Sequence, residues 1–70
     1  MNIRELVGIN IKKARNAKGW TQDELSHRSS VDRAYLSEVE SGKKNISVTR
    51  LELIARALEI DVRELFEGYE

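Results

Sequence analysis

The sequence predicts an all-helical fold, in which short helices pack into one small domain. Three observations support this class. Apolar residues recur along the whole chain at the three- and four-residue spacing of amphipathic helices. The 70 residues include no proline, and residues typical of helix ends interrupt the apolar pattern at short intervals. We therefore expect a single compact five-helix domain over residues 1–70.

The first helix is expected from Ile3 to about Lys18. Asn2 and Glu5 have the spacing of a capping box, in which each side chain accepts a hydrogen bond from the other residue's backbone N–H. Gly19 suits the left-handed backbone that often follows a helix. The stripe expected to be buried comprises Ile3, Leu6, Val7, Ile11 and Ala14.

The most informative segment is residues 21–42, whose pattern predicts two short helices joined by a tight turn. Thr21 and Glu24 have the spacing of a second capping box, so the second helix should start directly after Thr21. Asp32 is a strong N-cap for the third helix, which should stop at Gly42. This arrangement is the signature of a helix-turn-helix, which places its second helix in the major groove of DNA.

The third helix divides into two unlike halves when successive residues are placed about 100° apart. One half carries Tyr35, Leu36, Val39 and Glu40, and the other carries Arg33, Ala34, Ser37, Glu38 and Ser41. Small residues on the second half permit close approach to a DNA groove, where Arg or Glu can address base edges. The alternative is an ordinary exposed helix, and this helix alone supports both interpretations equally.

Two further helices complete the predicted domain. The fourth follows Ser47, and its buried side should carry Leu51, Ile54, Ala55 and Leu58. Asp61 and Glu64 have the spacing of a cap and its partner for a short final helix that ends near Phe66.

The C-terminal third holds more apolar residues than one small core should need. We assign four of them to a dimer interface: Leu53, Ile60, Phe66 and Tyr69. For Ile60, Leu65 and Phe66 taken individually, closing the end of the core is the simpler explanation. For Leu53 and Tyr69, a dimer contact is at least as well supported.

The net charge of the chain is zero, but the charges are unevenly distributed. Residues 1–20 hold five basic and one acidic residue, for a net +4, and residues 43–50 add +3. Residues 21–42 carry −3 and residues 51–70 carry −4. Because association with DNA depends on local neutralisation of phosphates, the basic regions are the candidate footprint, and the acidic C-terminal segment should face away from a polyanion.

Several functional classes find little support in the composition. The chain has no cysteine and therefore no disulfide framework or thiolate metal site. No apolar run resembles a signal peptide or a membrane span, so we expect a cytoplasmic protein with no membrane partner. His27 is the single histidine, and Ser29 and Ser30 have no evident base, so we expect neither an enzyme nor a cofactor or metal.

The chain resembles the Cro/cI-type (Xre-like) helix-turn-helix repressors, a group with a lambda-repressor-like fold, over nearly its whole length. The matching elements are residues 11–15 with Gly19, then Thr21, Gln22 and Leu25, then Leu36, Ser37, Glu40 and Gly42, and finally Leu51, Ile54, Ala55 and Leu58. Within that group, the runs VDRAYLSEVESGKKNIS and LELIARALEI look like stand-alone regulators, among them the controller proteins of restriction-modification systems.

The resemblance implies a homodimer that binds two-fold symmetric operator DNA, with the third helix in the major groove. It assigns base contacts to Arg33, Ala34, Ser37 and Glu38, and backbone contacts to Gln22, Tyr35, Lys43, Lys44 and Asn45. It also implies a partly buried ion pair between Arg15 and Glu40. The helical wheel supports this pair independently, because Arg15 adjoins the buried stripe and Glu40 lies on the inner half of the third helix.

Two residues depart from the family pattern, and some alternatives stay open. Ser30 stands where the turn usually has glycine, and Ser26 replaces a common alanine in the second helix. A protein-interaction module, such as an antitoxin-like or adaptor domain that uses the apolar C-terminal surface, is the alternative function. If the protein activates transcription, RNA polymerase would be a further partner. We expect the protein to be of bacterial or phage type and to be associated with the nucleoid.

Overall fold

The computed structural model describes residues 1–69, which form four α-helices and one 3-10 helix. The α-helices are α1 (Ile3–Ala17), α2 (Gln22–Ser29), α3 (Arg33–Glu40) and α4 (Val48–Leu58), and the 3-10 helix is η1 (Val62–Phe66). Residues 1–69 contain no strand, which confirms the all-helical prediction. The expected fifth α-helix is a short 3-10 helix instead, so the five-helix count needs that correction.

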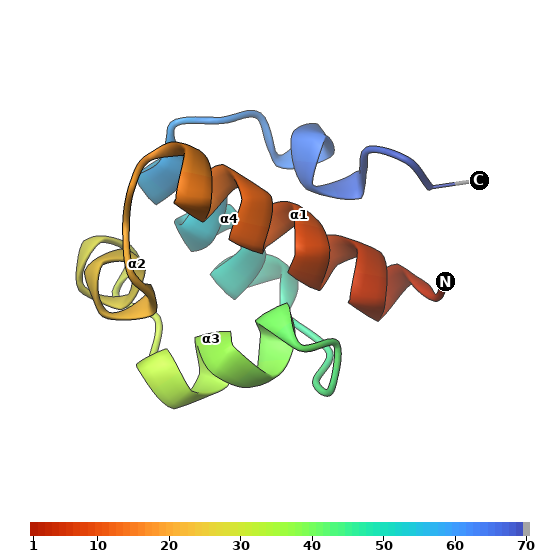
Figure 1. Cartoon of the computed structure of the whole chain (residues 1–70), viewed down its shortest axis with the longest axis horizontal. Coiled ribbons are helices and arrows are strands. Elements are labelled where there is room, and N and C mark those ends of the chain that lie inside the picture. Colours follow the sequence, from red (N-terminus) through yellow and green to blue (C-terminus); the bar gives the residue numbers. More distant parts are fainter. Residues whose placement is uncertain (70) are drawn as a thin grey trace.

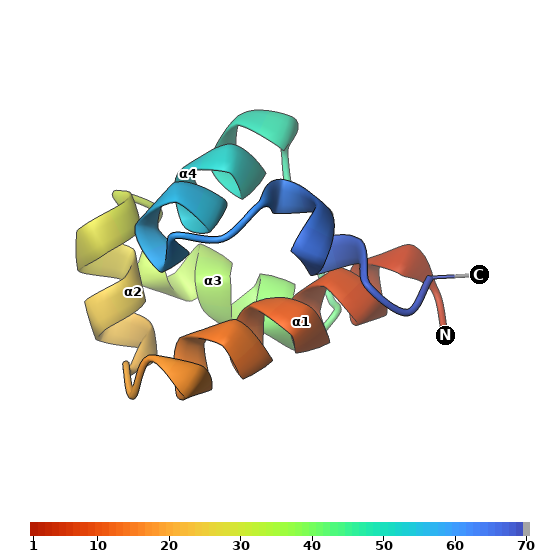
Figure 2. The ribbon, with the colours of Figure 1, turned by 90° about the horizontal axis from the view of Figure 1, so that it is seen from above.

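Helix α1 runs through the middle of the molecule and separates α3 from the C-terminal segment (Figure 1). It packs against α3 on one side and against η1 on the other, while α2 packs against both α3 and α4. The view from above shows α4 lying over α3, with η1 beside the N-terminal half of α1 (Figure 2). The described chain measures 31 × 21 × 21 Å along its principal axes. The arrangement leaves one side of α3 uncovered by other helices.

The helix boundaries follow the capping signals of the sequence. Asn2 and Glu5 form the expected capping box, with N–H to side-chain oxygen distances of 2.9 and 3.1 Å. The box expected at α2 is only half present. The Thr21 hydroxyl accepts from the Glu24 N–H at 3.1 Å, but the Glu24 carboxylate pairs with Arg28 at 2.6 Å instead of returning to the cap. A cation four residues further along the helix competes with the cap for that carboxylate.

One apolar core joins all the elements. It comprises Val7, Ile11, Leu25, Val31, Leu36, Val39, Leu51, Ile54, Ala55, Leu58 and Leu65. The four residues expected on the inner side of α4 are all buried. Ile3, which was expected in the buried stripe of α1, is 38% exposed because it lies in the first turn, at the edge of the domain.

Gly8 is buried where α1 crosses α3, a role the sequence analysis missed. A Cβ atom at this position would collide with the carbonyl oxygen of Val39 and would lie 2.9 Å from that of Glu40. Only glycine allows the two helix backbones to approach this closely. The contact therefore fixes α3 directly against α1.

The turn between α2 and α3 depends on a serine in left-handed backbone. Ser30 has φ of 62° and ψ of 23°, the conformation for which the family pattern prefers glycine. The neighbouring Ser26 hydroxyl donates to the Val31 carbonyl at 2.6 Å, so this second departure from the family pattern adds a hydrogen bond across the turn. Ser30 therefore adopts a backbone conformation that is strained for an L-residue, and the Ser26 hydrogen bond helps to hold the turn.

Ser30→Gly is expected to raise the free energy of unfolding by roughly 0.5–1 kcal/mol, because left-handed backbone costs an L-residue about 1–2 kcal/mol and the entropy of unfolded glycine offsets part of the relief. Urea denaturation followed by circular dichroism measures the change. Ser37→Gly is the matched control, since it removes the same side chain from helical backbone and should destabilise the fold. Destabilisation by Ser30→Gly would contradict this account.

Candidate nucleic-acid interface

Helix α3 presents a polar face to solvent and anchors its other face in the core. Asp32 caps the helix by accepting the Tyr35 N–H at 3.2 Å. Leu36, Val39 and Glu40 are buried, as expected for the inner half. The exposed residues Arg33, Ala34, Ser37 and Glu38 form what we call the outer face of α3. The division predicted from helical periodicity is confirmed.

The inner face is held by an ion pair between Arg15 of α1 and Glu40. The Arg15 Nε donates to Glu40 Oε2 at 2.8 Å, and Nη2 donates to Oε1 at 2.9 Å. Only 10% of the Arg15 side chain and 3% of the Glu40 side chain are exposed. The hydrogen bonds to Glu40 raise the pKa of the Arg15 guanidinium above its usual value, against the opposing effect of burial. The contact is therefore bidentate, the stronger geometry for such a pair.

Two further groups complete the network around this ion pair. Nη1 of Arg15 donates to the Trp20 carbonyl at 2.8 Å. The Gln22 side-chain NH2 donates to Glu40 Oε1 at 3.1 Å. Gln22 was expected to contact a DNA phosphate, but here its amide also ties α2 to α3. Since an amide NH2 carries two hydrogens, one donor remains for a phosphate. Among the described residues, no buried side-chain polar atom lacks a partner.

Tyr35 fixes the loop that follows α3. Its hydroxyl donates to the Asn45 carbonyl at 3.0 Å and accepts the Ser47 N–H at 3.2 Å. The Arg50 guanidinium lies 4.8 Å from the centre of the Tyr35 ring, and Nζ of Lys44 lies 5.5 Å from it. Arg50 was counted in the basic segment but given no role from the sequence. Its guanidinium lies over the aromatic ring that fixes this loop.

Two cations of this surface lie against carboxylates. Arg33 Nε is 2.8 Å from Asp23 Oδ1, and Lys44 Nζ is 3.4 Å from Glu38 Oε1. All four side chains are at least 45% exposed, so water and ions screen both pairs. Lys43 is also exposed, and within residues 1–69 no carboxylate lies within 4 Å of it. The pair between Arg33 and Asp23 joins α3 to α2, and sequence analysis assigned no role to Asp23.

The residues expected at the dimer interface differ in their burial and in the hollows that they line. Ile60 is half-buried against the core, whereas Leu53, Phe66 and Tyr69 are 37%, 39% and 61% exposed. Phe66 lines a mainly apolar groove of about 270 Å3. The other residues that line it are Ile3, Arg4, Val7, Val39, Lys44, Asn45, Ile46, Val48 and Leu51. Tyr69 lies at a separate hollow beside Met1 and Leu6. Val48, to which sequence analysis assigned no surface role, is 84% exposed and lines the same groove as Phe66.

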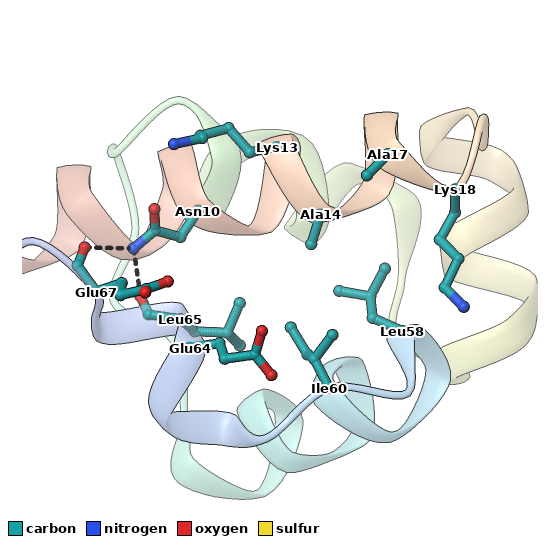
Figure 3. A pocket seen from close by; sticks show the side chains of 10 residues that line it. All are labelled: Asn10, Lys13, Ala14, Ala17, Lys18, Leu58, Ile60, Glu64, Leu65 and Glu67. Carbon is teal, nitrogen blue, oxygen red and sulfur yellow. Dashed lines mark hydrogen bonds between the residues drawn. The ribbon is translucent and has the colours of Figure 1, made fainter.

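A second hollow, of about 530 Å3, lies between α1 and the segment from Leu58 to Glu67 (Figure 3). The Asn10 amide closes one end by donating to the carbonyls of Leu65 and Glu67 at 2.9 and 3.0 Å. These bonds hold η1 against α1. Figure 1 shows α1 between α3 and the C-terminal segment, and none of the residues that line the hollow belongs to the outer face of α3.

In the described part of the chain, neither a metal-ligand cluster nor a membrane-spanning helix accompanies these surfaces. Within residues 1–69, no three His, Cys, Asp or Glu side chains are grouped so as to hold a metal ion. No described helix combines the length and the apolar character needed to span a membrane. His27 is exposed on α2, as expected. What this surface offers is charge and hydrogen-bonding groups on a fixed helix.

Comparisons with known proteins agree on one family. A model described as "Helix-turn-helix" matches residues 11–65. The uncharacterized HTH-type transcriptional regulator y4dJ of Sinorhizobium fredii is 42% identical over 65 residues, which cover 93% of this chain and 84% of that protein. Two solved structures are also similar. The restriction-modification controller protein C.AhdI from Aeromonas hydrophila has a TM-score of 0.87 at 38% identity and covers 90% of this chain and 96% of its own. The C.Esp1396I tetramer in complex with its natural 35 base-pair operator has a TM-score of 0.85 at 37% identity, with coverage of 96% and 88%.

Glu40→Ala is expected to lower the free energy of unfolding by on the order of 3–5 kcal/mol, because it leaves the buried Arg15 charge without its partner. Urea denaturation measures this loss. Glu24→Ala breaks an exposed ion pair with Arg28 and should cost less than about 1 kcal/mol. Equal effects of the two substitutions would show that the buried pair does not anchor α3.

Proposed function

The chain belongs to the helix-turn-helix family, and on this premise we propose that it is a transcriptional regulator that binds double-stranded operator DNA in a sequence-specific manner. The observation that carries the proposal is the exposure of Arg33, Ala34, Ser37 and Glu38 on one face of α3, while its opposite face is anchored in the core. A rigidly held helix with small and hydrogen-bonding side chains suits the major groove. The relative bound to its natural operator supports this proposal.

The outer face of α3 supplies the proposed base contacts. Arg33 addresses guanine through O6 and N7, for which the guanidinium fork is the best match. Ala34 meets a thymine methyl group, and Glu38 accepts from the N4 amino group of cytosine. Ser37 hydrogen-bonds to a base edge between them. None of these contacts requires catalysis, a metal or a cofactor, and we propose a binding protein rather than an enzyme.

The proposed backbone contacts flank that face. They involve Gln22, Tyr35, Lys43, Lys44 and Asn45, and the stacking of Arg50 on Tyr35 adds a further cation. Tyr35 contributes mainly by holding the loop, since its hydroxyl hydrogen is already donated to the Asn45 carbonyl. Such contacts set the register on the duplex without reading its sequence.

We further propose that the protein acts as a homodimer on a two-fold symmetric site. A single module of this size buries only about 600–1,000 Å2 on DNA, so useful affinity calls for two copies on half-sites roughly 34 Å apart. The apolar groove around Phe66, with Ile3 and Val48, is the favoured contact surface, and Leu53 extends the exposed apolar area. The tetrameric relative is consistent with assembly on DNA.

The regulatory setting follows from the DNA partner. A chromosomal target implies a cytoplasmic, nucleoid-associated location. The two controller relatives favour a role in a restriction-modification system as the narrower form of the proposal. Contact with RNA polymerase would be needed for activation, with the acidic residues of α2 or of the C-terminal segment as candidates.

Selection of bound duplexes from a random pool is expected to yield a two-fold symmetric consensus. On that consensus, Arg33→Ala should cost about 1–3 kcal/mol and relax the preference at one base pair, because a bidentate base contact is lost. Lys43→Ala should weaken binding to all sequences by a similar factor. It should also lower, by about one, the slope of the logarithm of the binding constant against the logarithm of the salt concentration. Fluorescence anisotropy at several salt concentrations measures both effects. A pool without any enriched sequence would refute the proposed function.

Phe66→Ser should shift the protein toward monomer, because it removes apolar area from the proposed contact surface. Ile9→Ser is the matched control, since Ile9 is 40% exposed but does not line that groove. Sedimentation velocity at several protein concentrations gives the association constant of each variant. If Phe66→Ser dimerises as the unsubstituted protein does while Ile9→Ser does not, the assignment of the surface is wrong.

A further inference from the structure

The ion pair between Asp23 and Arg33 joins the two helices of the helix-turn-helix. Asp23 is the second residue of α2, and Arg33 is the first residue of α3. Arg33 Nε lies 2.8 Å from Asp23 Oδ1. The Asp23 side chain is 79% exposed and the Arg33 side chain 55% exposed, so both face the solvent from which DNA would approach.

The geometry leaves Arg33 able to bind a base while Asp23 stays in contact. A guanidinium has five N–H donors. A carboxylate beside Nε uses the inner edge of the group, and the terminal amino nitrogens keep donors for the O6 and N7 acceptors of guanine. A carboxylate that restrains Nε therefore also restricts the directions in which those terminal nitrogens point.

We propose that Asp23 is a positioning residue that determines the specificity of Arg33, by aiming its guanidinium at one base and by withholding it from phosphates. This inference rests on the proposed function, and it assigns a role to a residue that had none in the sequence analysis. An exposed ion pair is weak, at about two- to fivefold in an equilibrium constant, so it restrains Arg33 without sequestering it. A guanine contact, at roughly 5- to 150-fold, easily coexists with it or outcompetes it.

The same carboxylate disfavours binding to DNA of arbitrary sequence. A phosphate near the start of α2 would be attracted by the exposed N–H groups of the helix end. Asp23 occupies that end with a negative charge of its own, which repels the phosphate and partly neutralises Arg33. Asp23 therefore lowers the affinity for every duplex, and the loss is largest for duplexes in which Arg33 has no guanine to bind. A repulsive element of this kind increases specificity.

The second pair on this surface follows the same pattern. Lys44, a proposed phosphate contact, lies 3.4 Å from Glu38 of the outer face. Two of the cations in the candidate interface are therefore held by carboxylates of the same interface. The net charge of −3 over residues 21–42 includes both carboxylates.

The test is a comparison of Asp23→Asn with the unsubstituted protein on three duplexes. These are the consensus selected from a random pool, the same duplex with the guanine assigned to Arg33 replaced, and a scrambled duplex. We expect Asp23→Asn to bind the scrambled duplex about two- to fivefold more tightly and to discriminate between the first two duplexes about two- to fivefold less well, in line with the strength of an exposed pair. Fluorescence anisotropy at two salt concentrations gives each dissociation constant.

Two controls separate positioning from general charge and from folding. Glu24→Gln removes the same charge from the same turn of α2, where the carboxylate pairs with Arg28 rather than Arg33. It should tighten all three duplexes by similar factors and leave the discrimination unchanged. Asp23→Glu keeps the carboxylate and should therefore discriminate between the duplexes better than Asp23→Asn does. In an Arg33→Ala background, Asp23→Asn should no longer alter discrimination.

The outcomes distinguish this inference from the function on which it rests. If the unsubstituted protein shows no preference among duplexes, the proposed function fails. If it discriminates and Asp23→Asn discriminates equally well, or changes all three duplexes by one factor as Glu24→Gln does, the assigned role of Asp23 is wrong. The inference is supported if Asp23→Asn discriminates less well between the duplexes while Glu24→Gln discriminates as well as the unsubstituted protein does.

Discussion

The buried ion pair between Arg15 and Glu40 is the contact on which the position of α3 depends. It acts together with the close backbone approach at Gly8, where α1 and α3 have no room for a side chain. The guanidinium also binds the Trp20 carbonyl, and the carboxylate also binds Gln22, so α1, α3 and the start of α2 share one hydrogen-bonded network. Since a buried charge without a partner is costly, this network tolerates few other arrangements. The outer face of α3 is consequently presented on a fixed support.

The loop after α3 connects the two candidate binding surfaces. Tyr35 holds this loop from the side of α3 through the Asn45 carbonyl and the Ser47 N–H. On its other side, the loop residue Ile46 borders the apolar groove that contains Phe66. A second copy packed in that groove would therefore contact the same loop that flanks the DNA face. In the proposed dimer, the loop after α3 would therefore contact the second copy and also flank the outer face of α3.

Much of this organisation is encoded locally in the sequence. The caps at Asn2, Thr21, Asp32, Ser47 and Asp61 all bind the backbone as expected, because a cap and its partner are two or three residues apart and need no distant contact. Helical periodicity separated the buried and exposed sides of α3 and α4 for the same reason. The left-handed backbone at Ser30 agrees with the family pattern, which prefers glycine there.

Where several partners or neighbours compete, only the tertiary structure decided the result. Glu24 pairs with Arg28 instead of closing its capping box, and Arg33 pairs with Asp23 of the preceding helix. Ile3 is exposed at the domain edge although its periodicity suggested burial. The grouping of Phe66 with Val48 joins segments that are distant in sequence. Sequence alone determined the four α-helices, their N-terminal caps and most of their inner faces, because hydrogen bonds and side-chain periodicity within one helix act over a few residues. The choice among charged partners and the assembly of surface grooves required the packed fold, because both depend on distances between helices that no local pattern specifies.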